Sequence, residues 1–345
     1  MSFKILFMVI AFIAGILFES VNKGKRYKFR KVLELVTTVY LLFKIGFFGG
    51  GELISQHWQT VFIQSIVVIV AASFWTLLVL RLLKRWSSFD RITQISIATH
   101  FGSVSVGTFI AALAFLNSMK IEVNPSVVIW LSIMEFPAII IGMWKLGVRA
   151  NTLFVIIKEK WTLAILPISI VLGMLFGTSI PSSIEFILFG KLFMPILLYF
   201  LFEMGCKASD SLGSLKKDLR SVFIVGIGVP ILGGIFGSSI GYWMGYSVSG
   251  MFIMAILMAS ASYVLAPLCM YEVLCGIYKP KLEIAKQVVA TSMALSVGVT
   301  LPFNILIGLE LYYMIIKVFQ VSPTLAFLGF VSPFLLGLMS LERWR

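Results

Sequence analysis

Long apolar runs separated by short polar segments repeat along most of the chain. Each run is about 15 to 25 residues long, and at about 1.5 Å per residue this is enough to cross a hydrocarbon core of about 30 Å. The pattern predicts ten membrane-spanning helices, near residues 5–18, 32–48, 61–80, 93–117, 124–144, 161–177, 186–206, 221–241, 251–276 and 287–313. A further apolar stretch at residues 322–341 is either an eleventh span or an interfacial helix.

Composition supports this pattern. The 345 residues are 59% hydrophobic and 12% charged, and the mean hydropathy of +1.02 is far above that of soluble domains. We therefore predict an all-α membrane protein. Residues 1–18 lack a basic region before the apolar run, so we expect them to be an uncleaved first helix and not a signal peptide.

The net charge of +13 indicates membrane topology and not a nucleic-acid partner, because the basic residues lie in short loops and not on one polar face. Lys and Arg concentrate in five alternate loops, at residues 23–31, 81–91, 145–160, 207–220 and 279–286. The other loops and the amino-terminal segment hold only Lys4, Lys120, Lys191 and Lys317. By the positive-inside rule, the five basic loops are cytoplasmic and the amino terminus is outside.

The two halves of the chain resemble each other weakly at an offset of roughly 160 residues. Four short segments recur in the same order: Gly15–Phe18 as Gly173–Phe176, Leu42–Gly46 as Leu201–Gly205, Gly102–Ser105 as Ala259–Ser262, and Ile139–Gly142 as Ile305–Gly308. Because the unit holds five helices, an odd number, the second copy must be inverted in the membrane. We expect repeats at residues 1–148 and 149–316, followed by an extension at residues 317–345.

Small and hydroxyl-bearing residues interrupt the fourth and ninth predicted helices at equivalent places. The segments are GSVSVGT at residues 102–108 and ASASYVLAP at residues 259–267. Inverted repeats place such interruptions at one depth, facing each other, and broken backbone is tolerated there only in a cavity or within protein. Freed amides suit an anion, while freed carbonyls and hydroxyls suit Na⁺. Close helix packing by small residues is the alternative interpretation.

Few other residues indicate chemistry. Glu135 and Asn304 lie in proline-containing segments of the two halves, MEFPA and LPFN. We expect the prolines to break both helices there, so that the two side chains offer hard oxygen ligands. Lys44 and Glu203 occupy equivalent repeat positions, so an ion pair between them is conceivable, with a structural role. His100 is interpreted as a packed, hydrogen-bonding histidine and not a proton relay.

Catalytic and metal motifs are missing from the sequence. It contains no H-E-x-x-H, no Walker loop and no strand-borne G-x-G-x-x-G, so neither an enzyme nor an ATP-driven pump is indicated. Cys206, Cys269 and Cys275 have no metal-like spacing. We expect no cofactor and no transition metal, with Na⁺ as the only metal ion.

Several blocks together resemble the sodium-dependent bicarbonate transporter family. They are KIGFFGG (44–50), SIATHFGSVSVGTFIAAL (96–113), MEFPA (134–138), LMASASYVLAP (257–267) and LPFNILIGLELYY (301–313). The resemblance covers roughly residues 30–313. It implies a gate domain of helices 1, 2, 6 and 7 and a core domain of helices 3–5 and 8–10. It also implies a homotrimer in the inner membrane of a bacterium, and inward transport of Na⁺ and HCO₃⁻ by sliding of the core against the gate.

The resemblance also implies binding residues. It places the anion and Na⁺ sites at the two breaks, at Gly102, Ser103, Ser105, Thr108, Ser260 and Ser262. Together with the oxygen ligands noted above, the expected anion site is Gly102, Ser103, Val104, Ser105, Ser260, Ala261 and Ser262, and the expected sodium ligands are Ser105, Thr108, Glu135, Ser262 and Asn304. Tyr263 stands where better-known cyanobacterial members have an acid, and Glu135 stands where they have aspartate. The loop at residues 145–160 is shorter than theirs, which bears on whether a cytoplasmic PII-like regulator binds.

Three hypotheses follow. The first is secondary active uptake of bicarbonate driven by Na⁺. The second is Na⁺/H⁺ exchange or Na⁺-coupled carriage of an organic anion, which similar folds perform. The third is a membrane sensor that binds an anion without moving it.

Overall fold

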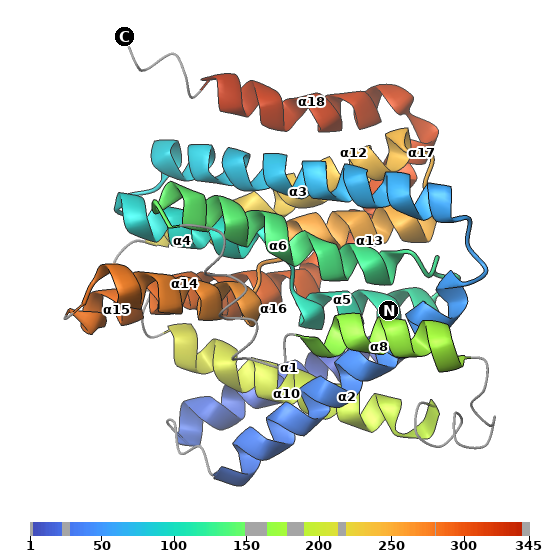
Figure 1. Ribbon diagram of the computed structural model, residues 1–345, viewed down its shortest axis with the longest axis horizontal. Helices are drawn as coiled ribbons and strands as arrows, with labels where there is room; N and C mark the ends of the chain where they lie inside the picture. The colour runs from blue at the N-terminus through green and yellow to red at the C-terminus, as the bar shows by residue number, and fades with distance from the viewer. Residues whose placement is uncertain are drawn as a thin grey trace.

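The computed structural model describes residues 3–22, 28–148, 164–177, 190–212, 219–279 and 281–339. Within these ranges all regular elements are helices, so the predicted all-α fold is confirmed for the described residues. In the upper part of the view in Figure 1 the helices run roughly side by side, and in the lower part they cross one another obliquely. Most of the loop at residues 145–160, which bears on regulator binding, lies outside the described residues.

The first half of the chain follows the predicted spans closely. Its helices are α1 (Phe3–Asn22), α2 (Lys28–Leu53), α3 (Trp58–Trp86), α4 (Arg91–Gly102), α5 (Val106–Ser118) and α6 (Val127–Lys145). Helices α4 and α5 together occupy the fourth predicted span, so this span is interrupted where the sequence indicated.

The second half begins with α8 (Ile165–Phe176) and α10 (Phe193–Leu212), which fall in the sixth and seventh predicted spans. The eighth is α11 (Leu219–Phe223), η5 (Ile224–Gly228) and α12 (Val229–Trp243), and the interrupted ninth is α13 (Val248–Ala259) and α14 (Leu265–Ile277). The tenth is a continuous helix with two π-helical stretches: α15 (Leu282–Met293), η6 (Ala294–Thr300), α16 (Leu301–Phe303), η7 (Asn304–Gly308) and α17 (Leu309–Val321). The last element is α18 (Pro323–Met339).

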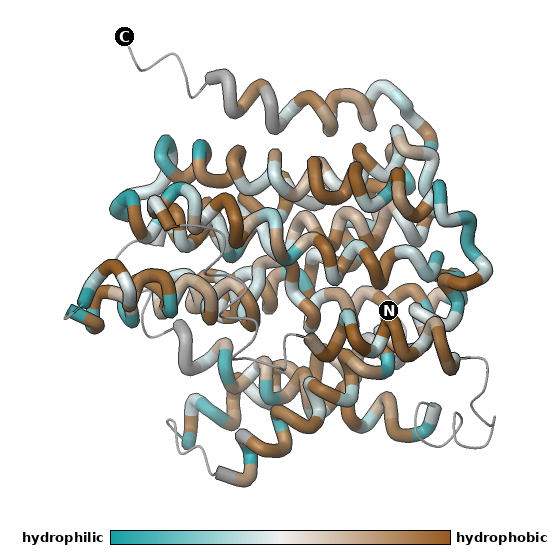
Figure 2. The backbone as a smooth tube through the Cα atoms, viewed as in Figure 1, coloured by the Kyte–Doolittle hydropathy of each residue, from teal (hydrophilic) through white to brown (hydrophobic). Residues whose placement is uncertain are grey.

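Six helical segments among the described residues are long and apolar enough to cross a membrane. They are Val32–Leu53, Trp58–Trp86, the interrupted Arg91–Ser118, Val127–Lys145, Arg220–Trp243 and Leu282–Val321. Polar residues gather toward the helix ends and connections, and the middle of the bundle is mostly apolar (Figure 2). Large apolar side chains also point outward along the bundle, such as Phe62 and Leu175, which are 68% and 65% exposed. This distribution is the one expected of a protein that presents its sides to lipid.

Two groups of helices pack against each other. In the first group α1 packs along α10 and α2 packs along α8, and these four helices form the lower part of the view in Figure 1. Glycines allow these close crossings: a Cβ on Gly15 would lie 2.0 Å from the Phe202 carbonyl oxygen, and one on Gly205 would lie 2.1 Å from that of Phe12. The second group, α3–α6 and α12–α17, forms the upper part, with both interrupted spans at its centre.

Helix α18 adds a further layer on the side of the second group that faces away from the first (Figure 1). It packs on α12, α3 and α17. The Phe330 ring stacks on Phe236 with centroids 5.9 Å apart, and Phe327 meets Trp243 edge to face at 6.3 Å. The 17-residue helix is about 25 Å long at about 1.5 Å per residue and turns back at Ser322 to run beside α12.

Candidate functional site

The centre of the second helix group contains two segments of extended backbone. Helix α4 ends at Gly102, Ser103 and Ser105 have extended backbone, and α5 starts at Val106. Helix α13 ends at Ala259, Ser260 is extended, and α14 starts at Leu265. The Ser105 side chain caps α5 by accepting a hydrogen bond from the Thr108 amide at 3.1 Å, which explains why the chain re-enters a helix at this point.

Hydrogen bonds join the two breaks directly. The Ser105 amide donates to Ser260 Oγ at 3.0 Å, and the Ser262 amide donates to the His100 carbonyl at 2.7 Å. The Gly107 amide donates to the Tyr263 hydroxyl at 2.9 Å. The two segments are therefore neighbours in space although they lie about 160 residues apart, as their positions in the two halves predicted.

All seven expected anion-site residues are brought together and buried. Ser103, Val104, Ser105, Ser260, Ala261 and Ser262 are at most 2% exposed, and Gly102 is also buried. Packing accounts for part of the pattern, because a Cβ on Gly102 would lie 2.0 Å from Thr76 Oγ1. Two polar atoms beside the break, Ser103 Oγ and His100 Nε2, are buried without a hydrogen-bond partner among the described residues.

The expected sodium ligands separate into three places. Ser105 and Thr108 share a hydrogen bond of 2.9 Å between their hydroxyls, and Ser262 Oγ accepts from the Ala266 amide at 3.3 Å. Asn304 lies behind the second break, where Nδ2 donates to the Ala259 carbonyl at 2.9 Å and Oδ1 accepts from the Tyr312 hydroxyl at 3.0 Å. Glu135 instead lines a cavity.

The expectation that prolines break the helices around Glu135 and Asn304 is wrong. Helix α6 continues through Pro137, and Pro302 lies in a continuous helix. The π-helical segments on either side of Pro302, η6 and η7, widen the helix there, and such widened turns accommodate a proline that has no amide proton to donate.

A cavity of about 430 Å³ lies between the two helix groups. Its wall comes from α2, α8 and α10 on one side and from α5, α6 and the second break on the other. Three ionisable side chains line it, Glu34, Lys207 and Glu135, and Glu34 forms an ion pair with Lys207. Tyr263 and Val106 also line it, so Tyr263 connects the cavity wall to the first turn of α5 through its hydrogen bond with Gly107.

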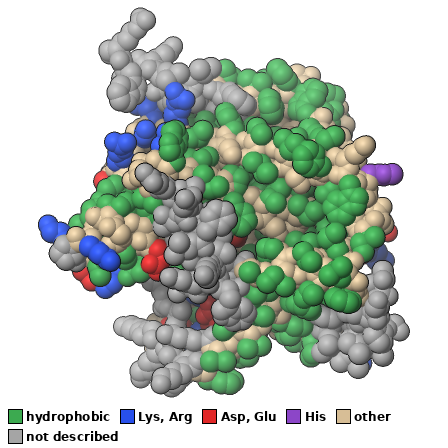
Figure 3. Space-filling view, viewed as in Figure 1, with side chains coloured by type: hydrophobic (Ala, Val, Ile, Leu, Met, Phe, Trp, Pro, Cys, Tyr) green, Lys and Arg blue, Asp and Glu red, His purple; other side chains and the backbone are tan. Residues whose placement is uncertain are grey.

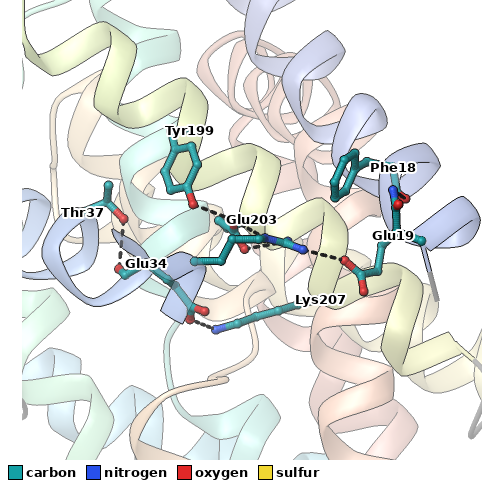
Figure 4. Close-up of polar contacts among 9 residues, drawn as sticks. Phe18, Glu19, Glu34, Thr37, Tyr199, Glu203 and Lys207 are labelled. Atoms are coloured by element: carbon teal, nitrogen blue, oxygen red, sulfur yellow. Dashed lines mark hydrogen bonds and ion pairs between the residues drawn. The ribbon is translucent and has the colours of Figure 1, made fainter. Parts of the chain in front are cut away.

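A network of charged side chains holds the first helix group together beside this cavity (Figure 4). Arg30 of α2 donates to both carboxylate oxygens of Glu203 on α10, at 3.1 and 3.0 Å, and to Glu19 of α1 at 3.1 Å. The Tyr199 hydroxyl donates to Glu203 at 2.7 Å. These hydrogen bonds, chiefly those to Glu203, raise the pKa of the Arg30 guanidinium above its usual range, although partial burial opposes this.

The conceivable ion pair between Lys44 and Glu203 does not form, because Arg30 occupies the Glu203 carboxylate. The Lys44 ammonium instead lies 3.4 Å from the centroid of the Phe193 ring. A cation over an aromatic face is a favourable contact.

Three residues of this region had no assigned role in the sequence analysis, namely Tyr263 as part of the site and Glu34 and Lys207 as part of the cavity. Tyr263 could have been found from its position within the second interruption. Glu34 and Lys207 lie near the ends of apolar runs, where charges are expensive and indicate function or pairing. His100 forms a hydrogen bond, as expected, between Nδ1 and the Ser96 carbonyl at 2.8 Å.

No group of three or more His, Cys, Asp or Glu residues in the described part of the chain is arranged to hold a metal ion. The hydroxyls and carbonyls of the two breaks are the hard oxygen ligands that Na⁺ accepts.

Broken helices that face each other within an apolar bundle, next to a cavity with charged walls, define a membrane transport protein. The family model described as the Na⁺-dependent bicarbonate transporter superfamily matches residues 7–317, and the chain belongs to this family. It is thus a multi-pass membrane protein of sodium-dependent bicarbonate transport, and α18 lies beyond the matched region. A search of curated proteins finds no significant match.

Proposed function

We propose that this protein is a symporter in which inward movement of Na⁺ drives uptake of bicarbonate. The observation that carries the proposal is the direct contact between the two breaks, through Ser105 to Ser260 and Ser262 to His100. Backbone groups released from helices at this depth are tolerated where they surround a ligand. Bicarbonate, with three oxygens and one negative charge, suits the released amides and the serine hydroxyls.

The arrangement of helices supports two inverted repeats of five spans. The crossing of α1 with α10 has a counterpart in the crossing of α2 with α8, and glycines lie at the contact in both. We assign α1, α2, α8 and α10 to a gate domain, and α3–α6 and α12–α17 to a core domain that slides against it. Inverted repeats permit such alternating access because each half adopts the conformation of the other.

The cavity between these domains is the proposed route from the site to one side of the membrane. It contains the carboxylates Glu34 and Glu135 and the ammonium of Lys207, so with all three ionised its charge is negative. A cation bound in the cavity offsets this charge and favours entry of an anion. We propose that Na⁺ supplies this balance at Ser105, Thr108 and Ser262, that Glu135 attracts it into the cavity, and that Asn304 positions the end of α13.

Sodium supplies enough energy for accumulation of the anion. At one Na⁺ per bicarbonate the transport moves no net charge, so the Na⁺ concentration gradient alone drives it. Each additional Na⁺ adds about 2.3 kcal/mol per 100 mV of membrane potential. Coupling needs only that Na⁺ and bicarbonate bind more tightly together than apart.

The charge distribution supports an orientation with the amino terminus outside. Lys and Arg side chains gather at one end of the visible face, near the α3–α4 and α14–α15 connections (Figure 3). By the positive-inside rule this end is cytoplasmic. We further propose that α18 is an eleventh span, that the protein lies in the inner membrane of a bacterium, and that the gate domains form a homotrimer. A PII-like cytoplasmic regulator is the candidate protein partner.

Uptake of labelled bicarbonate into proteoliposomes tests the proposal. We expect an inward Na⁺ gradient to raise the initial rate at least severalfold over a K⁺ gradient. Replacing Ser103 with Leu should abolish uptake, whereas replacing Ser73, which hydrogen-bonds to Ile69 of its own helix, should not. Uptake that ignores the Na⁺ gradient would contradict the proposal.

The same vesicles separate the other two hypotheses. For the second hypothesis, the vesicles are loaded with acid and Na⁺ is added outside without bicarbonate. A rise in the pH of the lumen would show that the protein exchanges Na⁺ for H⁺. Binding of bicarbonate without any flux would indicate a sensor.

A further inference from the structure

The hydrogen bonds at the two breaks are related by the repeat, and they differ at one place. Ser260 Oγ accepts from the Ser105 amide and donates to the Leu257 carbonyl at 2.9 Å. The equivalent hydroxyl in the first half is Ser103, because Gly102–Ser105 corresponds to Ala259–Ser262. Ser103 Oγ has no partner among the described residues, since the Ser262 amide donates directly to the His100 carbonyl.

Beside Ser103, the imidazole of His100 has one nitrogen without a hydrogen-bond partner among the described residues. His100 is 0% exposed, and its repeat equivalent is the apolar Leu257. His100 Nδ1 lies 2.8 Å from the Ser96 carbonyl oxygen. A carbonyl only accepts, so Nδ1 carries the proton. No described carboxylate forms an ion pair with the buried ring, so the ring is neutral and Nε2 presents a bare lone pair.

Three backbone carbonyls at this end of α4 and α13 already have side-chain or cross-break donors. The His100 carbonyl accepts from the Ser262 amide, the Phe101 carbonyl accepts from Trp75 Nε1 at 3.2 Å, and the Ala259 carbonyl accepts from Asn304 Nδ2. Ser103 directly follows the last residue of α4, three positions after His100, and both polar atoms, His100 Nε2 and Ser103 Oγ, are buried at this end of the helix. Together they form an unused acceptor and an unused hydroxyl beside the break.

We propose that His100 Nε2 accepts the O–H of bicarbonate, with Ser103 donating to one of the anion's charged oxygens, and that this pair selects bicarbonate over anions without a proton. The inference rests on the proposed function, because it names the feature by which that site recognises its anion. Nitrate has the same trigonal shape and charge as bicarbonate but no O–H group. Bound at the same place, nitrate directs an oxygen lone pair at the lone pair of Nε2, which is repulsive.

Two substitutions separate the acceptor from the structural bond to Ser96. In His100→Asn the side-chain amide nitrogen falls near the position of Nδ1, so it keeps the bond to the Ser96 carbonyl and leaves no acceptor at the position of Nε2. In His100→Gln the longer side chain places an amide oxygen near the position of Nε2. The first variant should lose selectivity, and the second should keep most of it.

The measurement is thermal unfolding of the purified protein in detergent with Na⁺, titrated with bicarbonate or with nitrate to obtain two apparent dissociation constants. We expect wild type to bind bicarbonate about tenfold or more tightly than nitrate. His100→Asn should reduce this ratio about tenfold while nitrate binding is retained or improved, which shows that the fold is intact. His100→Gln should stay within a fewfold of wild type.

Equal binding of nitrate and bicarbonate by wild type would overturn the inference, as would an unchanged ratio in His100→Asn or an equal loss in both variants. These outcomes are distinct from failure of the proposed function. If the protein binds bicarbonate selectively through His100 but does not transport it, the proposed function fails and the inference holds. If Na⁺-driven uptake does not discriminate against nitrate, the inference fails and the function holds.

Discussion

The Tyr263 hydroxyl is hydrogen-bonded to a backbone amide that could otherwise bind an anion. It accepts from the Gly107 amide in the first turn of α5, where unpaired amides and the helix dipole favour negative charge. A Cβ on Gly107 would lie 2.5 Å from this hydroxyl, so the small residue permits the contact. Tyr263 also borders the cavity, and so we interpret it as an internal competitor that an arriving anion displaces.

Replacing Tyr263 with Phe should strengthen anion binding severalfold, because the Gly107 amide is then free for the ligand. Without an anion the variant should be less stable by about 1 kcal/mol, which is the usual cost of losing one hydrogen bond. Thermal unfolding with and without bicarbonate measures both effects.

Tyr246→Phe is the matched control, because the Tyr246 hydroxyl is buried without a hydrogen-bond partner in the described part of the chain. It should leave anion binding unchanged and should not lower stability, because no hydrogen bond is lost. Equal behaviour of the two variants would show that the contact between Tyr263 and Gly107 has no energetic role.

At the level of single elements, a charged cap fixes where α4 begins. The Asp90 carboxylate accepts from the amides of Ile92 and Thr93 at 3.0 and 3.1 Å. Partial burial alone would raise the pKa of Asp90, but hydrogen bonds from the Thr93 hydroxyl and these amides outweigh it and lower the pKa below its usual value of 3.8. The ionised cap also interacts favourably with the amino-terminal end of the helix dipole.

Asp90→Ala should destabilise the protein by about 1 kcal/mol at neutral pH. Because the folded-state pKa is lowered, the contribution of Asp90 is complete above the unfolded pKa and is lost as the pH falls through the folded value. The difference between the unfolding midpoints of wild type and variant should therefore be constant at neutral pH and shrink below about pH 4. A difference that persists unchanged in acid would contradict this account of the cap.

Helix crossings in the first group depend on missing side chains. Gly205→Ala introduces a methyl group 2.1 Å from the Phe12 carbonyl, so α1 and α10 must separate, and overpacking of this kind costs about 1 to 3 kcal/mol. Gly276→Ala on α14 is the control, since nothing lies within 4 Å of its added Cβ and alanine favours a helix. Thermal unfolding should show a large loss for the first variant and no loss for the second. A reversed order would contradict the observed crossing.

The sequence predicted the elements better than their contacts. The interruptions at Gly102–Ser105 and Ala259–Ser262 could be predicted because glycine, serine and the cap at Ser105 act locally. The effect of the prolines could not be predicted from the sequence. The helix around Pro302 is preserved by π-helical turns, and α6 continues through Pro137.

Which side chains pair between helices could also not be predicted from the sequence. Glu203 pairs with Arg30 and not with Lys44, because the rotation of each helix about its axis decides which side chains meet. For the same reason the sequence placed the serines of the two breaks together but could not predict that Tyr263 would bond to Gly107 or that Ser103 would have no partner. Pattern and offset locate a segment along the chain, and packing decides its orientation.

The whole molecule is two helix groups with a charged cavity between them and α18 on the outer side of the second. In the proposed sliding mechanism, this placement lets α18 move with the core domain without obstructing its movement against the gate. It also determines the side on which the chain ends, since each span reverses the direction of the chain.

A reporter fused to the carboxyl terminus tests whether α18 spans the membrane. On the full chain, phosphatase should be inactive and a fluorescent protein active, because an eleventh span returns the chain to the cytoplasm. On a chain truncated after Val321 the result should be reversed. The same result for both chains would show that α18 lies along the membrane surface.

The central claim is that the two breaks together hold the transported anion. A cryo-electron microscopy structure of the protein with Na⁺ and bicarbonate tests it most directly. The account predicts density for a three-oxygen anion between Ser103–Ser105 and Ser260–Ser262, with the Tyr263 hydroxyl moved away from the Gly107 amide. Density for the anion at another place, such as beside Lys207 in the cavity, with the contacts between the breaks unchanged, would contradict it.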